Sequence, residues 1–265
     1  MLLTHPRRPL PHCITAHLLL MLVLLLTAAS ASAFNTGEHL TYDFSIDIPE
    51  LNISGKIGSV DLFILERTNI ASRIVYHACA RITSIDIINS LYPFNSEYHS
   101  WFDAETGTPY RIECFVHQGK WTNHTLLTNL PAFATATSNT GIYYDRRNTF
   151  GKKMRYPKNS ADIITALFTL RTRNRSIPYD FVWINYDRLH EVHFTFAASD
   201  AVRVKAFGRK PVPAVEISEK EYFGITAKLA DERDAIPLTL TIPALKFAGF
   251  SLVAQARLVK YETGQ

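Results

Sequence analysis

Apolar and polar positions alternate along most of the chain from residue 39 onward. Between residues 40 and 48, Leu, Tyr, Phe and Ile alternate with Thr, Ser and Asp. A period of two residues is typical of a strand with one buried and one solvated face. The same pattern recurs at 56–65, 73–84, 97–103, 109–118, 181–186, 191–197, 202–207, 214–219, 223–229, 236–247 and 250–261. Short connections between these segments predict a mainly β protein with a mainly antiparallel sheet.

Glycine and proline mark the turns between these segments. The stretch 103–109 carries Gly107 and Pro109, the residues expected between paired strands. Pro237 and Pro243 bracket a segment that cannot donate a full ladder of hydrogen bonds. We therefore expect residues 237–243 at a sheet edge or at a bulge.

One segment changes from a period of two to the period of a helix. Residues 160–173 place Ile163, Ile164, Leu167, Phe168 and Leu170 on about half of a cylinder. Ser160 is the expected N-cap, Asp162 suits the positive end of the helix dipole, and Arg171 and Arg173 suit the negative end. Such an apolar stripe in a β chain predicts one helix buried against the sheet.

Residues 1–33 have the pattern of a cleavable secretory signal peptide. Arg7 and Arg8 precede an apolar run at 18–29, and Ala31-Ser-Ala33 follows it. The run is well short of the roughly 20 residues of a membrane-spanning helix, so we expect no permanent membrane anchor. The predicted cleavage after Ala33 leaves 34–265 as a single β-rich exported domain in the periplasm.

Net charge favours no particular partner. The chain carries a formal net charge of +4, and without the two leader arginines the remainder carries +2.

Two thiols remain after cleavage, Cys79 and Cys114. They alternate with opposite faces of their strands, yet twisting strands would still allow a disulfide in an oxidising compartment. Without CxxC spacing, they do not predict a metal or redox site.

Four motifs resemble those of an exported bacterial family, Domain of Unknown Function 3108. They are Gly37-Glu-His-Leu-Thr-Tyr42, Ser100-Trp-Phe-Asp103 through Thr108-Pro109, Asp162-Ile-Ile-Thr-Ala-Leu-Phe-Thr-Leu-Arg171, and Leu229-Ala-Asp-Glu-Arg-Asp-Ala-Ile-Pro-Leu238 leading to Gly249. The acidic stretch Asp231-Glu-Arg-Asp234 in the last motif departs from the family pattern, in which a small residue is expected beside the Asp. The resemblance implies an envelope location and a large curved antiparallel sheet, or open half-barrel, packed around one α-helix. It implies no catalytic residue.

Sequence motifs of common enzymes are absent from the chain. No G-x-S-x-G, HExxH, Walker or dinucleotide-binding pattern occurs. His190 and His193 are three positions apart, an odd offset that places them on opposite faces of a strand. Two acidic groups, Asp103 with Glu105 and Asp231 with Glu232 and Asp234, lie beside turns, where carboxylates commonly cap the backbone. The sequence therefore leans against an enzyme, and it predicts no metal and no cofactor.

Candidate ligand-binding residues come from a basic run and from aromatic positions. Between 146 and 175 the chain has nine basic residues and one acid, Asp162: Arg146, Arg147, Lys152, Lys153, Arg155, Lys158, Arg171, Arg173 and Arg175. If they converge, they would receive phosphate or carboxylate groups, and otherwise they form a solvated rim. The predicted ligand-binding set is Arg171, Lys153, Arg155, Arg173, Trp101 and Tyr98. The two aromatic residues are equally compatible with a core position.

Three functions remain open on these observations. The preferred one is a periplasmic or secreted binding or carrier module for an apolar or anionic envelope ligand, a lipid or a glycan, held between sheet and helix. The alternative is a structural or assembly partner of other envelope proteins that docks through a strand edge such as 237–243. Less favoured is a hydrolase of glycans or lipids that uses the acidic groups. Export argues against a nucleic-acid partner.

Overall fold

The computed structural model describes residues 34–264 apart from 71, 92, 147–150, 209, 220, 222–223, 232–233 and 248–249. The predicted leader, together with Arg147, Phe223, Glu232 and Gly249, lies outside the described residues. Contacts group Phe34–Gln265 into one compact unit. In the described part, no helix is both long and apolar enough to cross a membrane.

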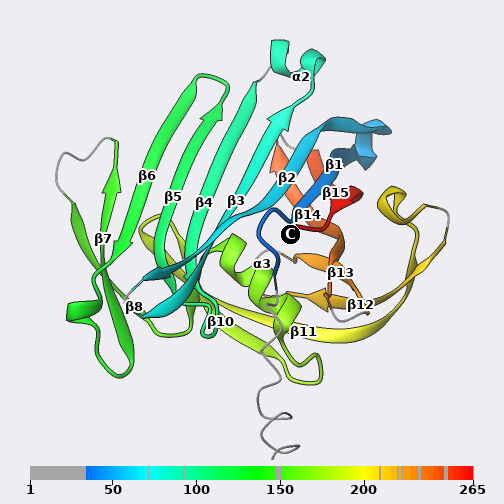
Figure 1. Cartoon of the computed structure of the whole chain (residues 1–265). Coiled ribbons are helices and arrows are strands. Elements are labelled where there is room, and N and C mark those ends of the chain that lie inside the picture. The colour runs from blue at the N-terminus through cyan, green and yellow to red at the C-terminus, as the bar shows by residue number, and fades with distance from the viewer. Residues whose placement is uncertain are drawn as a thin grey trace, which may run out of the picture. The chain divides into compact units, whose positions relative to one another are not determined.

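The described residues of this unit form fifteen strands with few helices (Figure 1). The strands are β1 (His39–Ile48), β2 (Ile53–Ile70), β3 (Arg73–Ser84), β4 (Phe94–Asp103), β5 (Pro109–Gln118), β6 (Trp121–Asn129), β7 (Ser138–Asp145), β8 (Lys152–Pro157), β9 (Ser160–Ala161), β10 (Tyr179–Asn185), β11 (Arg188–Val202), β12 (Val212–Ser218), β13 (Thr226–Ala230), β14 (Pro237–Phe247) and β15 (Phe250–Glu262). The α-helices are α2 (Asp86–Leu91) and α3 (Ile163–Thr172), and single 3-10 turns lie at Pro49–Leu51, Pro131–Phe133 and Lys205–Phe207.

The strands form one nearly closed, barrel-like sheet. Its order is β8-β7-β6-β5-β4-β3-β2-β1-β15-β14-β13-β12-β11-β10-β9, and every pair is antiparallel except β9 with β10. The first and last strands pair with each other, from His39 with Glu262 to Asp47 with Val253. The two sheet edges are therefore the middle strands β8 and β9. The predicted mainly β class and the antiparallel sheet around a helix are confirmed.

Residues 158–159 join these two edges, and side chains fill the seam. Tyr143, Met154 and Tyr156 of β7 and β8 pack with Ile184 of β10.

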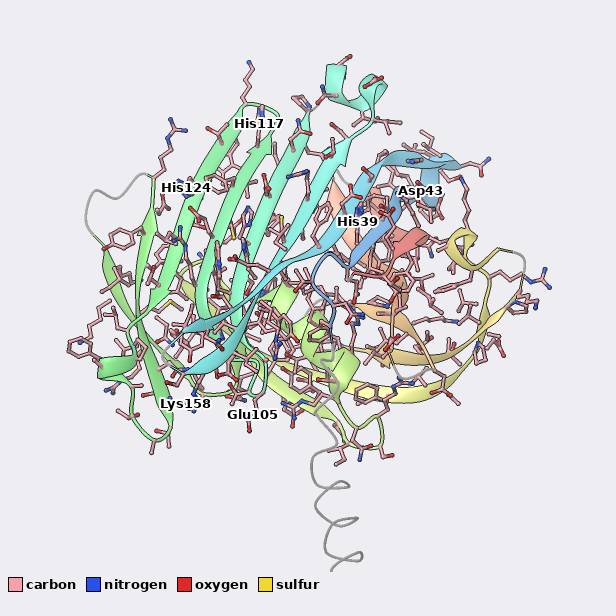
Figure 2. The ribbon with its side chains drawn as sticks, in the orientation of Figure 1. His39, Asp43, Glu105, His117, His124 and Lys158 are labelled. Carbon is pink, nitrogen blue, oxygen red and sulfur yellow. The ribbon has the colours of Figure 1, made fainter. Side chains whose placement is uncertain are left out.

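Short turns connect the antiparallel strands at both ends of the barrel. Figure 2 shows Glu105 and Lys158 at one end and His117 at the other.

Helix α3 is the crossover between the parallel strands β9 and β10, and it lies inside the barrel. It contacts β3 and β4 on one side and β10 on the other, as Figure 1 shows. Ile164, Phe168 and Leu170 are 1–3% exposed. Phe168 meets Phe34 edge-on at 5.1 Å between ring centroids and stacks on Phe102 at 6.1 Å. The helix thus supplies the centre of the core.

The N-cap of α3 is Asp162, two residues later than the predicted Ser160. The Asp162 carboxylate accepts hydrogen bonds from the backbone N–H groups of Ile164 and Thr165. Ser160 instead belongs to β9 and is buried. An ionised carboxylate satisfies exposed helix N–H groups at least as well as a hydroxyl does, which explains the shift.

Several strand predictions need correction. The alternation did not predict β6, β7 and β8; in β6 and β7 some inward positions are polar, since Asn123, Thr125 and Asn139 are buried there. Residues 205–207, predicted as strand, form a 3-10 turn. The segment 237–243 is not at an edge, because β14 pairs with both β13 and β15. The expected irregularity does occur, since the register shifts between Ile242 and Leu245.

Candidate functional site

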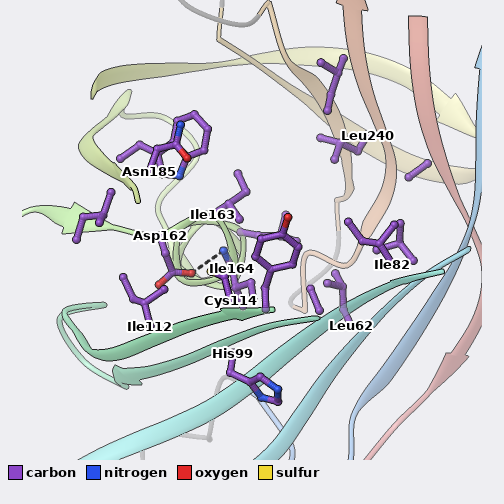
Figure 3. Close-up of a pocket in the computed structure, with 18 of the residues that line it drawn as sticks. Leu62, Ile82, His99, Ile112, Cys114, Asp162, Ile163, Ile164, Asn185 and Leu240 are labelled. Carbon is purple, nitrogen blue, oxygen red and sulfur yellow. Dashed lines mark hydrogen bonds between the residues drawn. The ribbon is translucent and has the colours of Figure 1, made fainter. Parts of the chain in front are cut away.

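An apolar cavity of about 450 Å³ occupies the part of the barrel interior that α3 leaves open (Figure 3). Strands from around the barrel contribute inward side chains two residues apart, as the period of a strand requires. These are Tyr42 and Phe44, Val60 and Leu62, Ala80 and Ile82, Ile112 and Cys114, Thr125 and Leu127, Leu240 and Ile242, and Ala254 and Ala256. The volume lies within the range of about 300–1,000 Å³ of small-molecule sites.

The first turn of α3 forms one wall of this cavity. Ile163, Ile164 and Leu167 line it, and Figure 3 shows Ile163 and Ile164 beside the space. Ile163 keeps 44% of its surface exposed, although the helix lies inside the barrel. The cavity is therefore open to solvent, and a large apolar side chain borders that opening. Filling the space with apolar atoms would remove this surface from water.

Asp162 is the charged group in the cavity wall, but its oxygens are engaged. Besides the two backbone N–H groups, its Oδ2 accepts from Ser100 Oγ at 2.6 Å and from Thr165 Oγ1 at 2.5 Å. Four donors satisfy the carboxylate internally. The residue is 4% exposed. Its role is to fix the start of α3 against β4.

Two further polar groups of the wall, the Cys114 thiol and the Tyr98 phenol, are neutral. Burial is the main cause that raises the pKa of Cys114 to about 12, and the Asp162 carboxylate adds to it. Burial also raises the pKa of Tyr98 above its usual value. The thiol and the phenol therefore keep their protons at neutral pH. The wall therefore favours apolar groups over anions.

A smaller polar pocket of about 340 Å³ adjoins the cavity at the β10–β11 turn. The two spaces share Tyr143, Asn185 and Tyr186. The polar pocket adds Trp121, Asn123, Asp145, Asp187 and Arg188. Tyr186 has a φ of 56°, a left-handed conformation that is uncommon for an aromatic residue and occurs at functional sites. An apolar space thus lies next to a polar one, with a constrained tyrosine between them.

Of the six predicted ligand-binding residues, only Tyr98 lines the cavity. Trp101 projects from the opposite face of β4, where it stacks on His77 at 3.9 Å between centroids. Arg171 is 4% exposed and forms a buried ion pair with Glu38 at 2.5 Å. Its Nε donates to the carbonyl oxygen of Asp234 at 3.0 Å. This pairing makes Arg171 an internal anchor of the α3 C-terminus.

The basic run does not converge on the cavity. Lys153 lies over the Phe133 ring at 5.0 Å, and Arg173 over the Tyr179 ring at 4.6 Å. Lys152 pairs with Asp187 at 3.2 Å, Arg175 with Asp231 at 2.5 Å, and Lys158 donates to Asn139 at 2.7 Å. Arg155 is exposed on β8. The cations with printed partners, Arg171 apart, thus contact different neighbours, as on a solvated rim.

Asp103 of the first acidic group has a structural role, and Asp231 of the second pairs with Arg175. Asp103 accepts from the N–H groups of Glu105 and Thr106 at 2.9 and 2.8 Å and pairs with Arg73 at 3.1 Å. The carboxylate therefore caps the β4–β5 turn.

His190 and His193 do not form a common site. His193 pairs with Asp180 at 2.9 Å, while His190 contacts the Trp183 ring.

Cys79 and Cys114 are free thiols. Cys114 lines the cavity, whereas Cys79 belongs to the outward set of β3 with His77 and Arg81. The predicted opposite facing of the two side chains explains why they do not meet. Burial, followed by the Glu97 carboxylate, raises the pKa of Cys79 to about 12.

Sequence reasoning did not single out Tyr143, Asn185, Tyr186 or Ile163 as site residues. Tyr143 lies on a strand that the alternation missed. Asn185 and Tyr186 precede Asp187, a turn-type composition that indicates a reversal but not a cavity. The apolar stripe of 160–173 did include Ile163, and nothing in a single stripe tells which of its members faces an open space.

No family model matches the chain, so the resemblance to Domain of Unknown Function 3108 stays a prediction. No curated protein matches it either.

Two solved structures resemble this fold. One is a beta-barrel-like protein of Domain of Unknown Function 1849 from Brucella abortus, with a TM-score of 0.57 at 13% identity over 88% of this chain and 100% of that chain. The other is a "putative lipoprotein" from Parabacteroides distasonis, with a TM-score of 0.34 at 9% identity over 87% of this chain and 98% of that chain. The second likeness is too weak to argue from. The first shows the fold alone, a barrel-like β domain that both chains share.

Proposed function

We propose that this protein is a binding or carrier module of the bacterial envelope whose barrel cavity takes the apolar chain of a lipid-like ligand. The observation that carries the proposal is the open apolar cavity, in which Ile163 of the internal helix is 44% exposed. Each methylene group moved from water into such a space contributes about 0.8 kcal/mol. A chain of several methylenes therefore gains enough free energy for binding.

The adjoining polar pocket supports an amphiphilic ligand. An apolar chain in the cavity would place its polar end near the Tyr143, Asn185 and Tyr186 boundary, beside Arg188. The predicted leader supports the envelope location, since Arg7 and Arg8 precede an apolar run and an A-x-A site. The separate pairing of Lys153, Arg173 and Arg171 does not favour a purely anionic glycan as the ligand.

The test is displacement of a fluorescent fatty acid from the purified protein, compared between two variants. Ile163→Trp fills part of the cavity and excludes two or three methylenes, which is about 2 kcal/mol, or roughly a thirtyfold rise in Kd. Ile177→Trp is the matched control, because Ile177 is 61% exposed and does not line the cavity. Equal Kd values for both variants and the unaltered protein would overturn the proposal.

Native mass spectrometry of protein purified without detergent adds a second measurement. We expect an adduct of lipid mass that disappears after extraction with organic solvent and in Ile163→Trp. An adduct that persists in Ile163→Trp and is lost in Ile177→Trp would place the ligand elsewhere. Protein that binds no fatty acid or lipid by either method would favour a function in assembly, and the free edges for docking are then β8 and β9.

A further inference from the structure

The outer face of β3 and β4 carries a separate group of side chains, one of which, His99, belongs to a residue that also borders the cavity. Cys79 stands directly opposite His99 in the strand pairing, and Arg81 stands opposite Glu97. Positions two apart on a strand share a face, so Cys79, Glu97 and His99 point the same way. Figure 3 shows the His99 ring on the side of its strand away from the labelled cavity residues.

Three potential ligand atoms of this group meet at one point. Glu97 Oε1 lies 3.6 Å from Cys79 Sγ and 3.3 Å from His99 Nε2, and all three ligand atoms are within 4.8 Å of one another. Tetrahedral zinc with bonds of about 2.0–2.3 Å holds its ligand atoms about 3.2–3.8 Å apart. The spacing is thus close to that of a cation site before the ligands close on the ion.

His99 is oriented for this role by a chain of contacts behind it. Its Nδ1 lies 3.0 Å from His77 Nε2, and His77 Nδ1 lies 3.4 Å from Glu66 Oε1. When His77 donates its Nδ1–H to Glu66, its Nε2 accepts the Nδ1–H of His99. That arrangement leaves a lone pair on His99 Nε2, directed at Cys79 and Glu97. Histidines that bind metals commonly have such an outer partner.

The neighbours hold this chain in place and also supply a competitor. His77 stacks on Trp101 at 3.9 Å between ring centroids, and its side chain is 13% exposed. Arg81 Nη2 donates to Glu97 Oε1 at 3.0 Å, and the Arg81 side chain is 53% exposed. An exposed guanidinium can move into solvent when a divalent cation takes its place beside the carboxylate.

We propose that Cys79, Glu97 and His99 bind Zn²⁺, or a similar borderline-soft divalent cation, on the outer face of the barrel. His77 and Glu66 act as positioning residues. The cation binds the Cys79 thiolate, the Glu97 carboxylate and the neutral His99 Nε2, and the thiol proton goes to solvent. Three protein ligands leave the fourth tetrahedral position for water or another molecule.

Titration of the purified protein with Co²⁺ alone tests the site directly. Tetrahedral cobalt bound to a thiolate gives a near-ultraviolet charge-transfer band and intense visible bands, and Zn²⁺ should abolish both. Cys79→Ser should remove the charge-transfer band and weaken binding about 100-fold or more, since even partners behind a ligand contribute about 10–100-fold. Cys114→Ser is the matched control, because Cys114 is the thiol on the inner face, and its spectrum should be unchanged.

The positioning role of His77 has its own readout. His77→Phe keeps a ring on Trp101 but removes the acceptor for His99. We expect binding about 10–100-fold weaker with the charge-transfer band retained at saturation. Arg81→Gln should strengthen binding by removing the competing cation. A His77→Phe protein that binds as tightly as the unaltered one would overturn the positioning role.

A measurement on the unaltered protein covers the case in which Cys79→Ser fails to fold. Under mild denaturant, Zn²⁺ should slow alkylation of Cys79 at least tenfold more than alkylation of Cys114, read by peptide mass spectrometry. Equal effects on both thiols would show general stabilisation and overturn the site. A cobalt spectrum without a thiolate band, or one that survives in Cys79→Ser, would do the same.

Discussion

The two parts of the barrel interior use consecutive inward positions of the same strands for different purposes. Around α3, Leu40, Tyr76 and Phe102 pack against Phe168 and are at most 3% exposed. Farther along the strands, Ile82 and Leu240 face the open cavity. Both sets are apolar, so hydrophobicity alone does not distinguish the packed part from the open one.

Length explains the difference. The 10-residue helix α3 is about 15 Å long, whereas a 12-residue strand such as β3 extends about 40 Å. One short helix cannot fill a barrel built from such strands. Helix α3 is therefore both the core of one part and a wall of the other, so substitutions in the two parts should affect stability and ligand binding separately.

The largest expected effect comes from the buried ion pair that anchors α3. Glu38→Ala leaves Arg171 as an uncompensated charge in the interior, which should lower the free energy of unfolding by about 3–5 kcal/mol. Urea denaturation measures it. Asp43→Ala is the control, because Asp43 pairs with Lys56 at the exposed surface, where a pair contributes about 1 kcal/mol or less. Similar losses for both variants would contradict the anchoring role of Glu38.

The packed and open parts are compared directly by truncating one apolar side chain in each. Phe168→Ala should cost about 3–5 kcal/mol, because it leaves a void among Phe34 and Phe102. Leu240→Ala should cost only about 1 kcal/mol, because its side chain already faces an open space. Fatty-acid affinity should fall more in Leu240→Ala among folded molecules. If Leu240→Ala lost as much stability as Phe168→Ala, the cavity would be closed in solution.

A smaller effect is expected at the start of the helix, where the two parts meet. Asp162→Ala removes the acceptor of four hydrogen bonds and should lower the free energy of unfolding by about 2 kcal/mol. Asp162→Asn keeps one acceptor oxygen and should lose less. Urea denaturation of both variants gives the ranking. Equal free energies of unfolding for Asp162→Asn and Asp162→Ala would mean that the negative charge, and not the acceptor oxygen, stabilises the helix.

The smallest effect concerns pH and the turn at the packed end of β4. Burial raises the pKa of Asp103, but hydrogen bonds from Thr106 and Arg73 lower it more, so the folded pKa is below its usual value. Ionised Asp103 therefore stabilises the fold above the unfolded pKa of about 3.9, and this contribution disappears as pH falls through the folded value.

Asp103→Asn should cost about 1–2 kcal/mol at pH 7 and progressively less below about pH 4. Denaturation at a series of pH values measures the difference. Glu105→Gln is the control, because Glu105 is exposed and contributes only its backbone N–H to Asp103. A cost of Asp103→Asn that stays constant at acid pH would contradict the assignment.

Alternation predicted the strands whose inward residues are apolar, and it failed where inward residues are polar. Residues 40–48 and 73–84 match β1 and β3 closely. The alternation did not predict strand β6, because its inward residues Asn123 and Thr125 are polar and buried. The helix was predicted from its stripe to within a few residues at its start and one at its end, with the cap misplaced by two. A search for alternating apolar residues does not detect strands whose inward positions are polar.

The sequence also predicted that Arg171 would meet a ligand and that the basic run between 146 and 175 would converge on it or form a rim. A one-dimensional cluster of charge does not reveal that Glu38, 133 residues away, is the partner of Arg171. Tyr98 was predicted and lines the cavity, because it lies on the inward face of its strand with the buried Ser96 and Ser100.

By itself the sequence determined the β class, the internal helix and the opposite facing of Cys79 and Cys114, because these follow from local periods of two and 3.6 residues. The tertiary structure decided the closure of β1 on β15, the cavity beside α3 and the meeting of Cys79, Glu97 and His99 across two strands. Strand pairing and register create these features, and both depend on contacts between residues far apart in the chain.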